Sequence, residues 1–201
     1  MALAALVMAG GKATRMGSAA EKPLLHVGDK PLIQLVVEAL KQSRSIDRII
    51  VAVSPRTQRT AETARALSVD VAETAGVGYE PDMKEAIKTL GLGDVAVVSA
   101  DLPFLTPRIV DEAVDKYLLS GKPALMVAAP VKLYRTYGME PLYVFDLDGQ
   151  ELAPVGLNII NGRRIDEPKL DETIFVVEAD DLVFNVNTPS DLEMARRKFA
   201  E

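Results

Sequence analysis

Glycines and basic residues near the start of the chain are placed where they could hold phosphate groups. Gly10 and Gly11 follow an apolar run, and Lys12, Arg15 and Lys22 come after them. Glycines let the backbone approach phosphate oxygens and turn amide N–H groups toward them, while lysine and arginine supply positive charge. The spacing is neither that of a P-loop nor that of a dinucleotide-binding fingerprint. We therefore interpret residues 10–17 as a phosphate-binding loop of another kind.

A carboxylate that could bind a metal follows a second apolar run. Asp101 follows the run over residues 94–100, so we expect it at the carboxyl end of a buried strand, where open α/β sheets bind their ligands. Mg²⁺ prefers oxygen ligands and commonly takes one or two protein carboxylates, with substrate phosphates and water completing its shell. Asp101 could instead cap the helix expected from Thr106, but Thr106 is the better cap because Pro107 follows it. We expect Asp101 to be a Mg²⁺ ligand.

Two asparagines near the end of the chain are also candidates. Asn185 and Asn187 alternate with apolar residues, so in a strand their side chains would share one face. Such a pair can be structural, because buried amides need hydrogen-bond partners, or it can lie beside a metal or a phosphate. The residues alone leave both roles open. The single histidine, His26, lies near a turn, and we interpret it as structural.

The elements that must position these residues form an alternating pattern. Short β-branched runs alternate with longer amphipathic segments, which indicates a doubly wound, mostly parallel α/β sheet of the Rossmann-like kind. The expected strands are 3–8, 48–53, 69–72, 94–99 and 124–129. The expected helices are 31–42, 55–67, 80–90 and 106–119.

Beyond residue 130 the pattern changes to a C-terminal β extension. We expect a hairpin that turns at Asp148-Gly149, with strands over 142–147 and from 152 onward. Further strands are expected over 173–177 and 182–187, before a last helix over 189–199.

Composition limits the class of protein. The 201 residues are 48% hydrophobic, which fits a single domain over 1–201 with its own core. With no cysteine and one histidine, disulfides and a thiolate or imidazole zinc site are excluded. A net charge of −6 without a basic stripe argues against nucleic acid, and no run is long enough to span a membrane. We expect a cytoplasmic protein with small-molecule partners, and a homodimer is left open.

The motifs at the start of the chain resemble those of a known family. Ala-Gly-Gly-x-x-x-Arg-Met-Gly over 9–17, followed by Lys22-Pro-Leu, is similar to the nucleotidyltransferases that include molybdenum-cofactor guanylyltransferases and sugar-phosphate nucleotidyltransferases. The resemblance implies that Arg15 and Lys22 stabilise charge on the α-phosphate and, with Asp101, are catalytic. Ala13 departs from the serine or glycine that is usual there. The residues that we assign to GTP are Met8, Ala9, Gly10, Gly11, Lys12, Thr14, Arg15, Lys22, Ser54, Gly76, Gly78, Asp82 and Leu102.

Two further stretches resemble members of that family that transfer GMP to a phosphorylated corrinoid. These are residues 76–82 and residues 154–160. The resemblance implies GTP and a phosphorylated corrinoid as partners, Mg²⁺ as cofactor, and acceptor contacts from Asn158, Asn185 and Asn187. We expect a loop over 131–138 to offer Lys132, Tyr134, Arg135 and Tyr137 to the large acceptor, or to be a solvated surface loop.

Other functions stay open at this point. Within the family, the alternatives are a molybdopterin guanylyltransferase and a relative that transfers a cytidylyl group or acts on a sugar phosphate. A nucleotide-binding regulator without turnover is the non-enzymatic alternative, and it is disfavoured because Arg15, Lys22 and Asp101 are all present.

Overall fold

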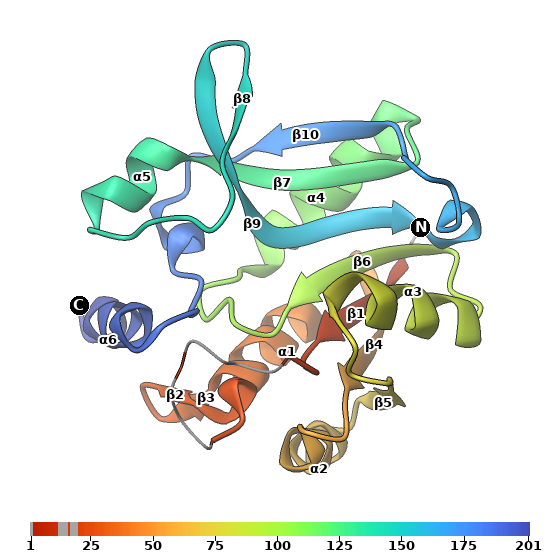
Figure 1. Cartoon of the computed structure of the whole chain (residues 1–201), viewed down its shortest axis with the longest axis horizontal. Helices are drawn as coiled ribbons and strands as arrows, with labels where there is room; N and C mark the ends of the chain where they lie inside the picture. The colour runs from red at the N-terminus through yellow and green to blue at the C-terminus, as the bar shows by residue number, and fades with distance from the viewer. Residues whose placement is uncertain (1, 12–15, 17–19) are drawn as a thin grey trace.

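The computed structural model describes residues 2–11, 16 and 20–201 (Figure 1). Within them, eight strands form one sheet in the order β10-β7-β9-β6-β1-β4-β5, and β8 pairs with β9. The strands are β1 (Leu3–Met8), β4 (Ile46–Val53), β5 (Asp70–Glu73), β6 (Asp94–Ser99), β7 (Ala124–Pro130), β8 (Phe145–Leu147), β9 (Gln150–Asn161) and β10 (Glu172–Val176). Two short strands, β2 (His26–Val27) and β3 (Lys30–Pro31), form a separate antiparallel pair.

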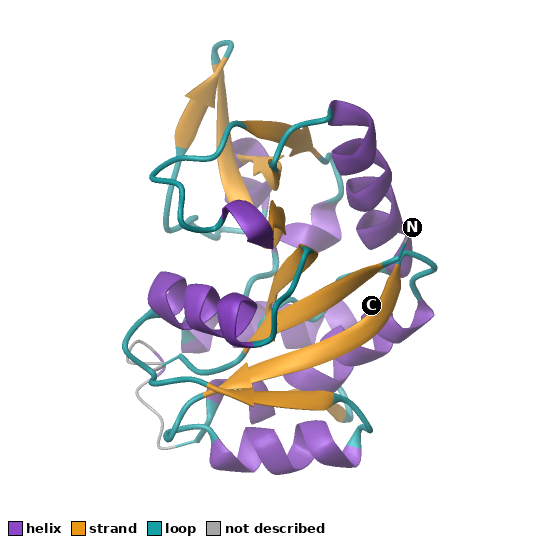
Figure 2. Ribbon diagram, turned by 90° about the vertical axis from the view of Figure 1, so that its right-hand side faces the viewer, coloured by secondary structure: helices purple, strands orange, loops and turns teal. Residues whose placement is uncertain are grey.

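The helices lie on both sides of the sheet (Figure 2). They are α1 (Leu32–Gln42), α2 (Gln58–Ala66), α3 (Tyr79–Thr89), α4 (Pro107–Ser120), α5 (Val131–Thr136) and α6 (Pro189–Phe199). Three 3-10 helices, η2 (Lys22–Leu24), η3 (Gly162–Arg164) and η4 (Asp180–Val183), complete the described elements. No helix among the described residues is long and apolar enough to cross a membrane.

The central strands are parallel, and their side chains supply two cores. Leu6 of β1 is level with Ile50 of β4 and Val97 of β6, and all three pack on the face covered by α3. The neighbouring Val7 belongs to the cluster on the other face, which includes residues of α1, α2 and α4. Side chains alternate between the faces of a strand, so these apolar runs fill both cores. The doubly wound, mostly parallel sheet expected from the sequence is confirmed.

The β extension begins with a helix rather than a loop. Residues 131–136 form α5, and Tyr134 is buried instead of being offered to solvent. Val131 and Tyr134 are one helical turn apart, so the helix buries both against the sheet. The hairpin strand also starts later than expected, at Phe145, because Leu142, Tyr143 and Val144 lie exposed outside the ladder.

The expected strand over 182–187 is also wrong. Leu182, Val183 and Phe184 are consecutive and all buried, which a strand with one covered face does not allow. Leu182 and Val183 end η4, and Phe184 begins an irregular segment that leads to α6. Helix α2 likewise begins at Gln58 rather than near Pro55, because residues 54–57 form a turn in which Thr57 N–H donates to the Ser54 carbonyl over 2.9 Å.

Helix α6 is held by a reciprocal cap at its start. The Thr188 hydroxyl accepts from the Asp191 amide over 3.2 Å, and the Asp191 carboxylate accepts from the amides of Thr188 and Asn187 over 2.7 and 2.9 Å. We predict that Thr188→Ala lowers the free energy of unfolding by about 1 kcal/mol, because one amide of the first turn loses its partner. Urea unfolding measures this. Thr188→Ser is the control and should retain most of the stability, and equal losses in the two variants would contradict the capping role.

Candidate active site

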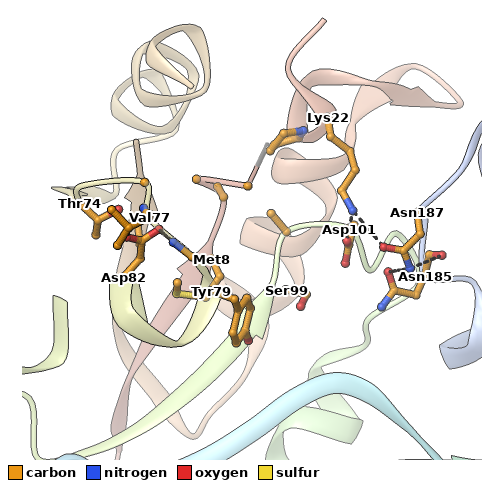
Figure 3. A pocket seen from close by; sticks show the side chains of 18 of the residues that line it. Met8, Lys22, Thr74, Val77, Tyr79, Asp82, Ser99, Asp101, Asn185 and Asn187 are labelled. Carbon is orange, nitrogen blue, oxygen red and sulfur yellow. Dashed lines mark hydrogen bonds and ion pairs between the residues drawn. The ribbon is translucent and has the colours of Figure 1, made fainter. Parts of the chain in front are cut away.

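A cavity of about 490 Å³ opens at the carboxyl ends of β1 and β6 (Figure 3). It lies where parallel α/β sheets bind their ligands. Its lining residues are Met8, Ala9, Gly10, Gly11, Lys22, Pro23, Ala52, Thr74, Gly76, Val77, Gly78, Tyr79, Asp82, Ser99, Ala100, Asp101, Leu142, Asn185 and Asn187. Thr74, Val77 and Asp82 lie on one side of the view, and Lys22, Asp101 and the two asparagines on the other.

An ion pair occupies the second of these sides. The Lys22 ammonium contacts Asp101 Oδ2, and it lies 3.3 Å from Asn187 Oδ1. The exposed fractions of the two charged side chains are 19% and 12%, so solvent screens the pair only in part. Asn187 in turn donates to Asn185 Oδ1 over 3.0 Å. The two asparagines therefore meet without the strand that was expected to align them.

The position of Lys22 is set by the residue before it. The Glu21 carboxylate accepts from the amides of Arg59 and Thr60 at the start of α2, over 3.0 and 2.7 Å, and from the Thr60 hydroxyl over 2.6 Å. A carboxylate at a helix N-terminus satisfies free N–H groups and is stabilised by the helix dipole. This contact fixes the chain where Lys22 extends toward Asp101.

One oxygen of Asp101 is available to a cation. Asp101 Oδ1 is buried and has no hydrogen-bond partner among the described residues, while Oδ2 is held by Lys22. A free, buried carboxylate oxygen suits a hard cation such as Mg²⁺. No cluster of three or more His, Asp or Glu able to hold a metal occurs in the described part of the chain. Asp101 therefore fits a metal whose remaining ligands come from phosphate oxygens and water.

A serine joins the two backbone segments on the opposite side. The Ser54 hydroxyl donates to the Gly10 carbonyl over 2.9 Å, and Ser54 is fully buried. Gly76 has φ of +69°, and a β-carbon there would lie 2.8 Å from the Ser54 β-carbon. Only glycine therefore fits at this position. Ser54, which was expected to bind GTP, does not line the cavity because it is fully buried behind the wall, where it holds the two segments together.

The segment after Gly76 is fixed by carboxylates of α3. Asp82 accepts from the amides of Val77 and Gly78 over 3.1 and 3.4 Å, and Glu85 accepts from the Ala75 amide over 3.1 Å. These bonds hold residues 75–78 against the first turns of α3. Asp82 is buried, and it shapes this wall of the cavity.

The middle of the cavity is lined by Tyr79 and Ser99. Tyr79 as a whole residue is 49% exposed, and its hydroxyl lies near Ser99. Burial of the hydroxyl raises the pKa of Tyr79 to about 12; the nearby Ser99 side chain opposes this shift, and the Asp101 charge adds to it. The phenol is therefore neutral at physiological pH and can act as a hydrogen-bond donor.

A second chamber, of about 250 Å³, adjoins the first. Tyr79, Ser99, Leu142, Asn185 and Asn187 line both. The other lining residues of the second chamber are Tyr134, Met139, Glu140, Pro141, Tyr143, Pro154, Gly156, Asn158, Val183 and Asp191. The two chambers therefore share a wall beside the Lys22–Asp101 pair.

A glycine brings β9 close to this shared wall. Gly156 has φ of +90°, and a β-carbon there would lie 2.9 Å from the Ser99 hydroxyl oxygen. The register between β7 and β9 shifts at the same level, between Met126 and Ala128. The irregularity leaves space for the second chamber, on which Asn158 borders.

The structure brings most of the predicted residues to these chambers. Met8, Ala9, Gly10, Gly11, Gly76, Gly78 and Asp82 line the first, and Asn158 lines the second. Leu102 is fully buried in the core and does not line either chamber. Lys12, Thr14 and Arg15 lie outside the described residues. His26 is exposed on β2, away from both chambers.

Sequence reasoning did not single out several lining residues. Ser99 could have been found, because it ends the strand that precedes Asp101. Tyr79 directly follows Gly78, which was singled out, but its inward hydroxyl depends on the turn into α3. Of the four residues that the loop over 131–138 was expected to offer to the acceptor, only Tyr134 lines a chamber. Lys132 and Arg135 form exposed ion pairs with Glu178 and Glu151.

A glycine-lined cavity at the carboxyl ends of parallel strands, with a lysine–aspartate pair beside it, is the arrangement of a nucleotide-handling α/β enzyme. The model of the MobA-like NTP transferase domain matches residues 5–153, and the chain belongs to this family. The nucleotidyltransferase enzyme expected from the motifs is thereby confirmed at the level of the family.

Two relatives are similar over nearly the whole chain. The adenosylcobinamide-phosphate guanylyltransferase of Methanocaldococcus jannaschii is 36% identical over 95% of this chain and 94% of its own length. A probable molybdenum cofactor guanylyltransferase of Thermococcus gammatolerans is 30% identical over 92% of this chain and 95% of its own.

Two solved structures show the same fold. The CMP:2-keto-3-deoxy-manno-octonic acid synthetase in complex with CTP matches 99% of both chains with a TM-score of 0.78 at 17% identity. The molybdopterin-guanine dinucleotide biosynthesis protein A of Archaeoglobus fulgidus matches 98% of this chain and 99% of its own with a TM-score of 0.69 at 20% identity. At these identities the likeness concerns the fold.

We predict that Asp82→Ala increases the mobility of the backbone at Val77 and Gly78, which lines the first chamber. Without the carboxylate, the amides of Val77 and Gly78 lose their acceptor, which should lower the free energy of unfolding by about 1–3 kcal/mol. Urea unfolding gives the loss, and hydrogen exchange should show faster exchange at both amides. Glu80→Ala, which removes an exposed carboxylate of the same helix, is the matched control. Unchanged exchange in Asp82→Ala would contradict this role.

Proposed function

We propose that the protein transfers GMP from GTP to adenosylcobinamide phosphate, releasing pyrophosphate and forming adenosylcobinamide-GDP. The observation that carries the proposal is the Lys22–Asp101 pair, which lies beside the wall shared by two chambers of different character. One chamber is bordered by glycines and backbone segments, as a nucleotide requires, and the other by polar, aromatic and apolar side chains without a lysine or arginine among its described lining residues. The similarity to the Methanocaldococcus jannaschii enzyme supports this choice of donor and acceptor.

The chemistry needs charge stabilisation rather than a strong base. An oxygen of the acceptor phosphate attacks the α-phosphorus of GTP, and the bond from that phosphorus to the bridging oxygen breaks, so the electron pair leaves with pyrophosphate. The phosphate monoester is already anionic near neutral pH, so no general base is required. The Lys22 ammonium reduces the repulsion between the two anionic reactants and stabilises the charge that develops on the α-phosphate.

Mg²⁺ is the proposed cofactor, and Asp101 Oδ1 would hold it. When bound, the cation supplies positive charge that neutralises phosphate oxygens. The Lys22 contact keeps Asp101 Oδ2 engaged and leaves Oδ1 directed to the cation. Asn187, which contacts Lys22, is placed to orient the acceptor phosphate, with Asn185 fixing its amide. We place Lys12 and Arg15 on the triphosphate from the family motif alone. The cytoplasmic location and the homodimer stay predictions.

Pyrophosphate release tests the proposal directly. The purified protein is incubated with GTP, ATP, CTP or UTP, with and without adenosylcobinamide phosphate. We expect release only with GTP and the acceptor together, because water is a poorer nucleophile than the positioned phosphate. Release without dependence on this acceptor would contradict the assignment.

A second candidate is molybdopterin guanylyl transfer, which the Thermococcus gammatolerans relative favours. Molybdopterin added to the same assay separates the two. Turnover with molybdopterin and none with the corrinoid would transfer the assignment to this candidate.

We predict that Asp101→Asn lowers kcat by at least about a hundredfold, because the variant loses the negative charge that would hold Mg²⁺ against the phosphates. Circular dichroism should show an intact fold, since asparagine has nearly the same shape. Asp47→Asn, an exposed aspartate on β4, is the control and should keep full activity. Near-normal turnover of Asp101→Asn at saturating Mg²⁺ would exclude Asp101 as the metal ligand.

We also predict selectivity for guanine. Residues 76–78 line the first chamber on rigid backbone, where hydrogen bonds to the base edge would favour guanine over adenine. Titration calorimetry should give a Kd for ATP at least about tenfold above that for GTP. Similar affinities for the four nucleotides would rule out this segment as the reader of the base.

A further inference from the structure

The second chamber is too small to enclose a corrinoid. Its volume is about 250 Å³, whereas cavities that enclose drug-sized ligands are about 300–1,000 Å³. A corrin macrocycle with its adenosyl group is larger than such ligands. Under the proposed function, therefore, only the phosphate-bearing arm of the acceptor fits inside, and the macrocycle must lie outside the chamber.

The wall of the chamber continues onto an exposed apolar strip, which we define as Leu142, Tyr143 and Val144. Their exposed fractions are 66%, 63% and 41%, and the first two residues also line the chamber. Tyr143 stacks on Phe145, with ring centroids 6.2 Å apart and an angle of 28° between the rings. Contiguous exposed apolar side chains on a folded protein usually mark a binding surface. The strip directly precedes β8, whose hairpin with β9 projects at the top of Figure 1.

Inside the chamber, one hydroxyl group lacks a partner. Tyr134 is 3% exposed and lines the chamber, and its hydroxyl has no hydrogen-bond partner among the described residues. Burial raises the pKa of Tyr134 to about 12, so the group retains its proton and can donate. An unsatisfied buried hydroxyl destabilises a fold, which makes a ligand oxygen a plausible partner.

The charges around the chamber suit an uncharged part of the acceptor. No lysine or arginine is among its described lining residues, and of its two carboxylates Asp191 is engaged in the cap of α6. Lys22 is the one lysine or arginine among the described lining residues of the first chamber. The phosphate therefore belongs at the shared wall, and the amide-containing arm that joins it to the macrocycle belongs beside Tyr134 and Asn158.

We infer that the acceptor binds in two parts: its arm enters the second chamber and accepts a hydrogen bond from Tyr134, and its macrocycle lies outside on the strip. The inference rests on the proposed function. It replaces the acceptor contacts that were expected from Lys132 and Arg135 in the 131–138 segment, because these two side chains form ion pairs with Glu178 and Glu151. A second copy of this chain is the other occupant that could cover the strip, and the experiment distinguishes it.

The test compares three variants with the parent enzyme. Tyr143→Ser/Val144→Ser removes most of the strip, and Tyr134→Phe removes only the hydroxyl. Leu118→Ser/Leu119→Ser, which replaces exposed leucines of α4 at a distance from the strip, is the matched control. The measurements are the KM for adenosylcobinamide phosphate, the Kd for GTP, the melting temperature, and the molar mass in solution by light scattering.

We expect the strip variant and Tyr134→Phe each to raise the acceptor KM by about tenfold or more, with GTP affinity unchanged. Tyr134→Phe should not lower the melting temperature, because the hydroxyl loses no partner in the unliganded protein. A purely structural hydroxyl would give the opposite result, with a lower melting temperature and an unchanged KM. The control should match the parent in every measurement.

Each contrary outcome has its own meaning. If the parent enzyme is active and the strip variant has an unchanged acceptor KM, the strip does not bind the macrocycle. If that variant is also a monomer where the parent is a dimer, the strip is a subunit interface. An unchanged KM in Tyr134→Phe would refute the hydrogen bond. A parent enzyme inactive with the corrinoid would instead overturn the proposed function, and the inference with it.

Discussion

The ion pair between Lys22 and Asp101 joins three parts of the chain that are far apart in sequence. Lys22 comes from the segment after the glycine loop, and Asp101 follows β6. The Asp101 carbonyl accepts from the Val186 amide over 3.1 Å, while Lys22 reaches Asn187, which ties in the segment before α6. Because both charges are largely removed from water, neither can lose its partner without leaving a charge poorly solvated. The relative positions of the glycine segment, the end of β6 and the segment before α6 therefore depend on this contact.

The architecture around the pair follows from strand direction. Parallel β1 and β6 end at the same edge, so their last residues line one cavity. The antiparallel β9 enters next to β6 and brings Gly156 and Asn158 to the same edge. A single strand of opposite direction thus adds the second chamber to the crevice that a parallel α/β sheet forms at its carboxyl edge.

The sequence was most informative where one local pattern decides the structure. The apolar runs before Gly10 and Asp101 predicted buried strands and placed both residues at the cavity, because strand ends in a parallel sheet share an edge. It was least informative beyond residue 130. Residues 131–136 are too few to show helical periodicity, and the alternation of Asn185 and Asn187 imitates a strand. Tyr134 was read as exposed because its burial depends on packing between α5 and β9, which no local pattern encodes.

The wall shared by the two chambers has a thermodynamic consequence. Tyr79, Ser99, Asn185 and Asn187 line both chambers, so a ligand that orders these side chains in one chamber would change the conformational entropy lost on filling the other. By linkage, whatever factor a ligand in one chamber adds to affinity in the other, the second ligand must add to the affinity of the first. Under the proposed function, the two substrates would be coupled through these four uncharged polar side chains, and the free energy of the ternary complex would be the same whichever substrate binds first.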